Sequence, residues 1–261
     1  MVIVSDLHFG GTTALCPPYG IKLENGGLNM PNLAQKWIWA RWLDFWDVVK
    51  VSRKRGRHAV VVVNGEFVDG FHHDSTELAT NSPEMMAQAA LEAFSPIGAI
   101  AHELFATLGT EAHSGKGSAS DLSIARQLGA RVNPATGQHA FQELDLLRGG
   151  ILFDIAHHVS GGSRYTTRGN NIKAELLDML IERPEVNVVV RSHVHTFAET
   201  GRNFGPRRHG VVTPAWQLKT AFGSRVTRQR VTQVGGIIYE LQAGEFNFRP
   251  ILYDVPKRNP M

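Results

Sequence analysis

Cysteine is nearly absent from this sequence, in which Cys16 stands alone among 261 residues. A single thiol excludes an internal disulfide framework and a zinc site made of cysteines, and it is typical of a reducing compartment. Long hydrophobic runs are also missing, since no apolar stretch approaches the roughly 20 residues that span a bilayer. We therefore expect no membrane association.

A signal peptide is not indicated either. The first apolar stretch, in MVIVSDLHFG, is short and is followed at once by Asp6 and His8, whereas a secretory signal needs a longer apolar region. We expect a cytoplasmic protein.

An excess of charge of one sign is lacking as well. The 27 Lys and Arg residues nearly balance the 24 Asp and Glu residues, and the formal net charge is +3. This composition argues against a dedicated nucleic-acid-binding protein, although nucleic acid stays open as a partner. The absence of repeats, linkers and low-complexity segments predicts a single domain over residues 1–261, and nothing in the sequence indicates the oligomeric state.

The hydrophobic pattern alternates between strands and helices. Helices are predicted at about 32–53, 83–94 (capped by Ser82), 118–128 and 170–182. Strands are predicted at 2–5, 59–64 and 186–190, with a hairpin at 139–148 and 151–156 that turns at Gly149 and Gly150. Residues 101–109 fit either state, 10–31 form a long loop, and the chain after 209 consists of strands and turns. This order predicts an α/β protein with mixed sheets.

Histidine, by contrast, is abundant. Most of the twelve histidines follow a predicted strand and stand beside Gly, Asp or Glu, namely His8, His72, His73, His113, His157, His158, His193 and His195. One such histidine is more often a buried, hydrogen-bonded side chain than a ligand. Because so many occur at strand ends, a metal site is the better interpretation.

The spacing of these residues supports that interpretation. Asp6 and His8 stand two apart after a strand, so both side chains can leave the same face and bind one ion. His193 and His195 repeat this spacing after the strand at 186–190. In VVVNGEFVDGF, Glu66 follows another buried strand and supplies a carboxylate. The same edge of the fold could therefore hold two adjacent ions.

Imidazole and carboxylate ligands without thiolate favour Mn²⁺, Fe²⁺ or Zn²⁺ over Ca²⁺ or Mg²⁺. Two such ions about 3.5 to 4 Å apart generate a hydroxide nucleophile and stabilise charge during displacement at phosphorus. Hydrolysis of a phosphoester substrate is the reaction class that this chemistry predicts.

In their order along the chain, the motifs resemble the calcineurin-like metallophosphoesterase family. That pattern is Asp-x-His, Gly-Asp-x-x-Asp, Gly-Asn-His with Asp or Glu, a lone His, and Gly-His-x-His. Asp6 and His8 match the first motif, and His157 or His158 matches the fourth. Gly65 to Asp69 nearly match the second motif and Ser192 to His195 the fifth, whereas Gly109 to His113 stand in the place of the third. The resemblance covers residues 6–195, does not identify the substrate, and implies a two-sheet mixed β sandwich flanked by helices.

The resemblance also implies roles for the metal ligands. One ion would be held by Asp6, His8 and His195, and the other by His193 together with His157, which comes before His158 after its strand. Both would be divalent transition metal ions, with Mn²⁺ favoured. A hydroxide that bridges them would attack a phosphodiester or a phosphomonoester.

Two departures from the family pattern affect this assignment. Glu66 stands where the family has a bridging Asp, so Glu66→Asp is expected to retain or raise activity. No Asn follows Gly109, and either Thr110 (by register) or Glu111 (by chemistry) would replace its oxygen at the second ion. Asp69 would orient a neighbouring ligand, and His113 would protonate the leaving group or contact phosphate.

Wording such as DGFHHDS and AHHVSGG also resembles a phage or prophage-type branch of the family. Two alternatives to the phosphoesterase remain open at this stage. One is a metal-dependent nuclease or nucleic-acid end-processing enzyme, and the other is a non-catalytic metal-binding module with a degenerate site. Candidate phosphate contacts are Arg164, Arg168 and Arg191.

Overall fold

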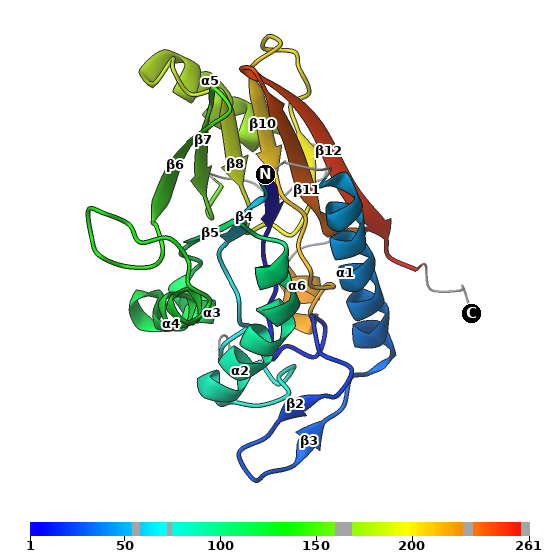
Figure 1. Ribbon diagram of the computed structural model, residues 1–261. Coiled ribbons are helices and arrows are strands. Elements are labelled where there is room, and N and C mark those ends of the chain that lie inside the picture. Colours follow the sequence, from blue (N-terminus) through cyan, green and yellow to red (C-terminus); the bar gives the residue numbers. More distant parts are fainter. Residues whose placement is uncertain (54–57, 72–74, 160–168, 227–231, 257–261) are drawn as a thin grey trace.

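The computed structural model of the chain describes residues 1–53, 58–71, 75–159, 169–226 and 232–256. Two five-stranded sheets pack face to face, and helices cover their outer faces (Figure 1). The mixed α/β sandwich predicted from the sequence is thereby confirmed.

The first sheet has the strand order β12-β11-β1-β4-β5. Its strands are β1 (Val2–Val4), β4 (Val60–Asn64), β5 (Glu103–Thr107), β11 (Gln233–Gln242) and β12 (Glu245–Asp254). β4 runs parallel to both β1 and β5, whereas β11 pairs antiparallel with β1. The segment 101–109, which the sequence left open between strand and helix, contains the strand β5.

The second sheet has the order β6-β7-β8-β10-β9. It contains β6 (Glu143–Arg148), β7 (Ile151–Ala156), β8 (Val188–Arg191), β9 (Ala198–Glu199) and β10 (His209–Val212). β8 is parallel to β7 and β10. The β6–β7 hairpin turns at Gly149 and Gly150, both with positive φ, which confirms the predicted turn.

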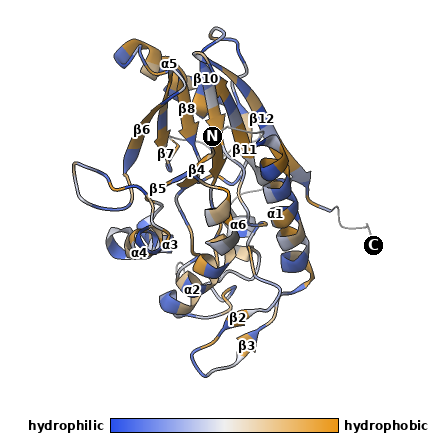
Figure 2. Cartoon of the chain, in the orientation of Figure 1, coloured by the Kyte–Doolittle hydropathy of each residue, from blue (hydrophilic) through white to orange (hydrophobic). Residues whose placement is uncertain are grey.

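Alternating strand residues fill the space between the sheets. Ile3, Val62 and Tyr239 of the first sheet pack with Phe153 and Val190 of the second, and all are fully buried. In Figure 2 the inner strands β4 and β8 are mostly hydrophobic, as expected for segments buried on both faces.

Helices close the outer faces. α1 (Leu33–Ser52) begins with a capping box in which Asn32 and Gln35 exchange hydrogen bonds, and its Trp42 and Trp46 pack under the first sheet. α2 (Pro83–Phe94) is capped by Ser82 as predicted, and α4 (Ala119–Gln127) lies beside it. α5 (Asn170–Glu182) covers the second sheet through Ile172 and Leu176.

Small elements depart from the sequence expectations. The loop predicted at 10–31 contains a two-stranded ribbon, β2 (Ile21–Lys22) and β3 (Leu28–Asn29). The end of the chain, predicted to be strand and turn, also contains the short helix α6 (Ala221–Val226). A four-residue helix, α3 (Glu111–Ser114), and two 3-10 turns, Ser95–Ala99 and Lys116–Ser118, complete the described elements.

Candidate metal centre

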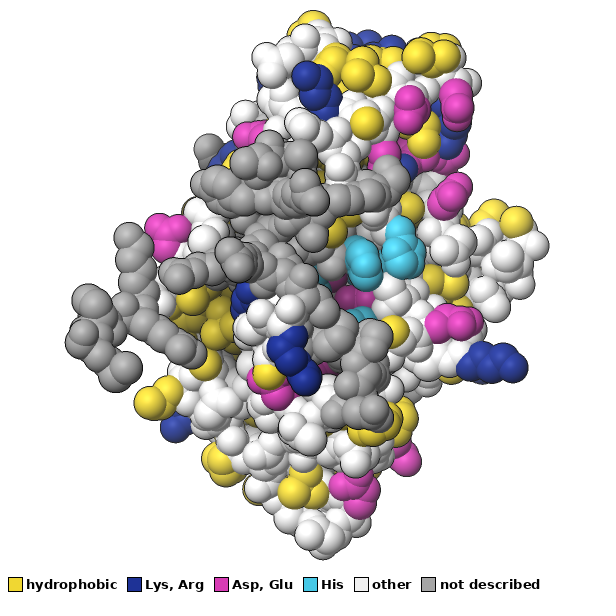
Figure 3. Space-filling model, turned by 180° about the vertical axis from the view of Figure 1, so that it is seen from behind, with side chains coloured by type: hydrophobic (Ala, Val, Ile, Leu, Met, Phe, Trp, Pro, Cys, Tyr) yellow, Lys and Arg dark blue, Asp and Glu magenta, His cyan; other side chains and the backbone are white. Residues whose placement is uncertain are grey.

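The carboxyl ends of the parallel strands meet at one edge of the sandwich. Asp6 and His8 follow β1, Glu66 follows β4, His157 follows β7, and the pair His193 and His195 follows β8. In Figure 3 histidine side chains gather around a hollow of this face, with acidic side chains beside them. Strands that are distant in sequence thus deliver carboxylates and imidazoles to one place.

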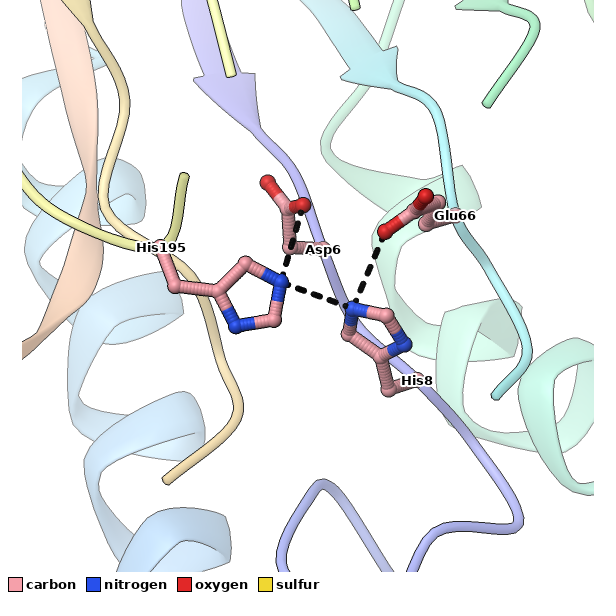
Figure 4. Close-up of side chains that lie close together, drawn as sticks. All are labelled: Asp6, His8, Glu66 and His195. Carbon is pink, nitrogen blue, oxygen red and sulfur yellow. Dashed lines mark hydrogen bonds and ion pairs between the residues drawn. The ribbon is translucent and has the colours of Figure 1, made fainter. Parts of the chain in front are cut away.

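Four of these side chains form a first group (Figure 4). His8 Nε2 lies 3.1 Å from Glu66 Oε2 and 3.1 Å from His195 Nε2. His195 Nε2 is 3.3 Å from Asp6 Oδ1. One ligand atom from each residue lies within 4.8 Å of the others, which is close enough to surround one ion.

Glu66 also belongs to a second group, together with His157 and His193. Glu66 Oε1 is 3.2 Å from His157 Nε2 and 3.9 Å from His193 Nδ1. The choice between the two adjacent histidines falls on His157, which is 1% exposed, whereas His158 is exposed. Because Glu66 is shared, its two oxygens face two different sets of ligands.

Asp69 and His113 form a third group with His8. Asp69 Oδ1 lies 3.0 Å from His8 Nδ1, so the carboxylate fixes the ring whose other nitrogen faces Glu66. His113 Nδ1 is 2.6 Å from the Asp69 carbonyl oxygen. The structure therefore places Asp69 behind a candidate ligand and His113 at the rim of the same site.

The structure separates Thr110 from Glu111. Thr110 donates its hydroxyl to Glu66 Oε1 at 2.7 Å, whereas Glu111 is exposed and accepts a hydrogen bond from the Gly117 amide. Thr110 occupies the N-cap position of α3 and Glu111 its first turn, so the helix directs Glu111 outward. Of the two residues, the structure brings Thr110 to the cluster and leaves Glu111 outside it.

The backbone at this site adopts an unusual conformation. Seven described non-glycine residues have positive φ, and five of them are candidate ligands, namely Asp6, His8, Glu66, His193 and His195. This left-handed region costs free energy for residues with a Cβ and is concentrated at functional sites. Residues two apart, such as Asp6 and His8, are therefore brought together by sharply turned loops after the strands. The spacing in the sequence instead predicted extended strand geometry.

Charges within the cluster shift its pKa values. Burial alone would lower the pKa of His8, but Asp69 and Glu66 outweigh it and raise that pKa to about 10. Burial would also lower the pKa of His157, but Glu66 and Asp6 outweigh burial and raise that pKa to about 9. For Glu66, burial favours the neutral acid, yet His157 and His113 hold its pKa well below the ordinary value. The raised pKa values favour the protonated forms of His8 and His157 beside the buried carboxylates.

Two buried polar residues escaped the sequence analysis. Asp121, in α4, is fully buried and accepts backbone hydrogen bonds from Glu66, Phe67 and Gly109. No spacing could reveal it, because its partners are backbone groups. Asn64 could have been identified from the sequence, because it is the one polar residue in the apolar strand VVVVN.

The prediction that Arg191 contacts phosphate was wrong. Its guanidinium is buried and pairs with Asp154 at 2.7 Å and with Glu175 at 2.6 Å, so it faces the second sheet and α5. Arg164 and Arg168, like His72 and His73, lie outside the described residues.

Comparison with known proteins gives only distant likenesses. No family model and no curated protein matches the chain. Among solved structures, Vps29 from Chaetomium thermophilum has 10% identity and a TM-score of 0.40, with 98% of each chain covered. Vacuolar protein sorting 29 from Cryptosporidium parvum has 12% identity and a TM-score of 0.39, with 97% of each chain covered. A predicted phosphoesterase from Streptococcus pneumoniae has 12% identity and a TM-score of 0.32, covering 96% of each. Likenesses this distant carry no argument about function, which must come from the site.

Among the described residues, no helix is both long and apolar enough to cross a membrane.

Proposed function

We propose that this protein is a calcineurin-like metallophosphoesterase that holds two divalent transition metal ions and hydrolyses a phosphoester. The observation that carries the proposal is the position of Glu66. One buried carboxylate is shared by two groups of ligands, Asp6, His8 and His195 on one side and His157 and His193 on the other. A carboxylate shared in this way suits a bridge between two cations that would otherwise repel each other.

The donor atoms fit such ions. Asp6 Oδ1, Glu66 Oε2, His157 Nε2 and His193 Nδ1 are buried polar atoms that have no hydrogen-bond partner in the described part of the chain. Leaving such atoms without a partner costs free energy, and a cation would satisfy all four. The set is nitrogen and oxygen without sulfur, which favours Mn²⁺, Fe²⁺ or Zn²⁺, and we propose Mn²⁺ as the native ion.

The chain's own residues would divide the work around the ions. When bound, the two ions would activate water and neutralise the charge of the phosphate. Asp69 keeps His8 oriented from behind, and Thr110 holds one oxygen of Glu66. His113 Nδ1 donates to the Asp69 carbonyl oxygen at 2.6 Å, which holds the ring at the rim of the site, and we propose this imidazole as the group that protonates the leaving group.

Metal content and hydrolysis test the proposal together. Protein stripped of metal is titrated calorimetrically with Mn²⁺ and then offered an aryl phosphodiester, an aryl phosphomonoester and single-stranded DNA, with Mn²⁺, Ni²⁺, Zn²⁺ or Mg²⁺. We expect about two ions per chain and metal-dependent turnover of one aryl ester, both reduced in Glu66→Ala. Cleavage of DNA alone would favour the nuclease. Two bound ions without turnover of any substrate would refute the enzyme.

A further inference from the structure

Asn64, the last residue of β4, has a fully buried side-chain amide and stands two residues before the candidate ligand Glu66. The four residues before it are valines that pack into the sandwich, so a polar side chain here requires partners. Those partners come from both sheets.

The side chain makes three hydrogen bonds. Asn64 Nδ2 donates to the Ala156 carbonyl oxygen at 3.0 Å and to Ser192 Oγ at 2.6 Å. Asn64 Oδ1 accepts from Thr107 Oγ1 at 2.6 Å. A carbonyl oxygen can only accept, so the contact with Ala156 fixes which end of the amide is the NH₂ group.

These contacts have a definite direction. Since Asn64 donates to Ser192, the Ser192 hydroxyl is free to donate onward to Thr213 Oγ1, which lies 2.7 Å away. The backbone oxygen of Asn64 lies 2.7 Å from His157 Nδ1 and accepts its proton, which leaves Nε2 facing Glu66. The amide and carbonyl of one residue therefore orient groups in both sheets.

The side-chain partners of Asn64 in the second sheet stand next to ligands of the second group, whereas its backbone oxygen also accepts a hydrogen bond from Ser5, which precedes Asp6 of the first group. Ala156 precedes His157, Ser192 precedes His193, and Asn64 itself stands two residues before Glu66. These three ligands form the second group described above.

We propose that Asn64 is a positioning residue for the ion held by Glu66, His157 and His193, and not for the ion held by Asp6, His8 and His195. The inference rests on the proposed two-metal function. Its amide fixes the starting points of the loops after β7 and β8, so a change in the amide displaces His157 and His193, the two ligands that belong to this ion alone. Groups that orient ligands in this way typically contribute 10- to 100-fold to metal affinity.

The main test is Asn64→Asp, which keeps the shape of the side chain and replaces the NH₂ donor by an acceptor. Ser192 can reverse its hydroxyl, but the Ala156 carbonyl then faces an oxygen. Ser192→Ala is the second variant in case Asn64→Asp does not fold. The matched control is Thr213→Val, which removes a fully buried hydroxyl from the same chain but leaves every contact of Asn64 intact.

Calorimetric Mn²⁺ titration of the stripped proteins measures the result. We expect Asn64→Asp to weaken one ion at least tenfold and the other less than threefold, and Ser192→Ala to weaken the same ion to a smaller degree. Thr213→Val should lower the melting temperature and still bind both ions as the wild type does. In a His193→Ala background, which removes a ligand of the same ion, Asn64→Asp should change the remaining affinity less than threefold.

Two kinds of failure are distinguishable. A wild-type protein that binds fewer than two ions would overturn the proposed function, and this inference with it. If the wild type binds two ions and Asn64→Asp weakens both equally or neither, Asn64 has a structural role alone.

Discussion

The contact between Glu66 and Thr110 makes a prediction about how these two residues depend on each other. The family pattern that the sequence resembles has a short Asp and a long Asn where this chain has a long Glu and a short Thr. Thr110 Oγ1 donates to Glu66 Oε1 at 2.7 Å. The longer acid therefore reaches the shorter neighbour, and each departure from the family pattern compensates for the other.

The magnitude follows from this distance. Glu66→Asp withdraws the carboxylate by one carbon–carbon bond, about 1.5 Å, so its separation from the Thr110 hydroxyl grows to about 4 Å and the hydrogen bond is lost. A hydrogen bond to a charged group contributes about 1.5 to 3 kcal/mol, which corresponds to about 10- to 150-fold in metal affinity or turnover. This prediction is the opposite of the expectation from sequence, in which Glu66→Asp alone retains or raises activity.

A double-mutant cycle provides the assay. We expect Glu66→Asp and Thr110→Asn each to lower Mn²⁺ affinity and phosphodiester turnover, and the double variant to recover most of both, with a coupling energy of about 1 to 3 kcal/mol. Thr213→Val is the control, since its hydroxyl is fully buried but bonds Ser192 and not Glu66. Additive effects in the double variant would refute the reasoning.

Four further predictions concern the same site. Ion binding should release protons at pH 7 from His8 and His157, because their pKa values are raised to about 10 and 9. Calorimetric titrations in buffers of different ionisation enthalpy measure the number of protons released. Equal heats in all buffers would contradict this prediction. Because both folded-state values exceed the ordinary 6.5, their contribution to the stability of the metal-free protein is full below about pH 6.5. This contribution to stability is lost as the pH rises through 9 to 10, and the melting temperature measured as a function of pH would show the loss. Asp121→Ala should cost about 2 to 4 kcal/mol in urea unfolding, because it leaves buried amides without an acceptor, and a cost below 1 kcal/mol would show that water replaces it. His157→Ala should lose one ion while His158→Ala keeps both, and the opposite result in metal analysis would exchange their roles.

The sequence predicted which candidate residues lie together, because these carboxylates and imidazoles follow the strand ends. Parallel strands such as β1 and β4 place their carboxyl ends at one edge, so Asp6 and Glu66 had to be neighbours once both strands were recognised. The choice between Thr110 and Glu111 could not be made in the same way, because it depends on where α3 begins. Asp121 was beyond reach, since it binds loops 54 and 55 residues away through their backbones.

The left-handed backbone at five candidate ligands lowers the stability of the folded chain at the positions that the proposed function requires. Glycine would relieve the conformational cost at each of these positions, about 1 kcal/mol or more per residue, but it would remove the ligand. Since the net stability of a domain is only about 5 to 15 kcal/mol, five such positions are a considerable burden on the metal-free chain. Bound ions would compensate for that burden, so a descendant that no longer needed metal could gain stability through glycine substitutions at these same sites.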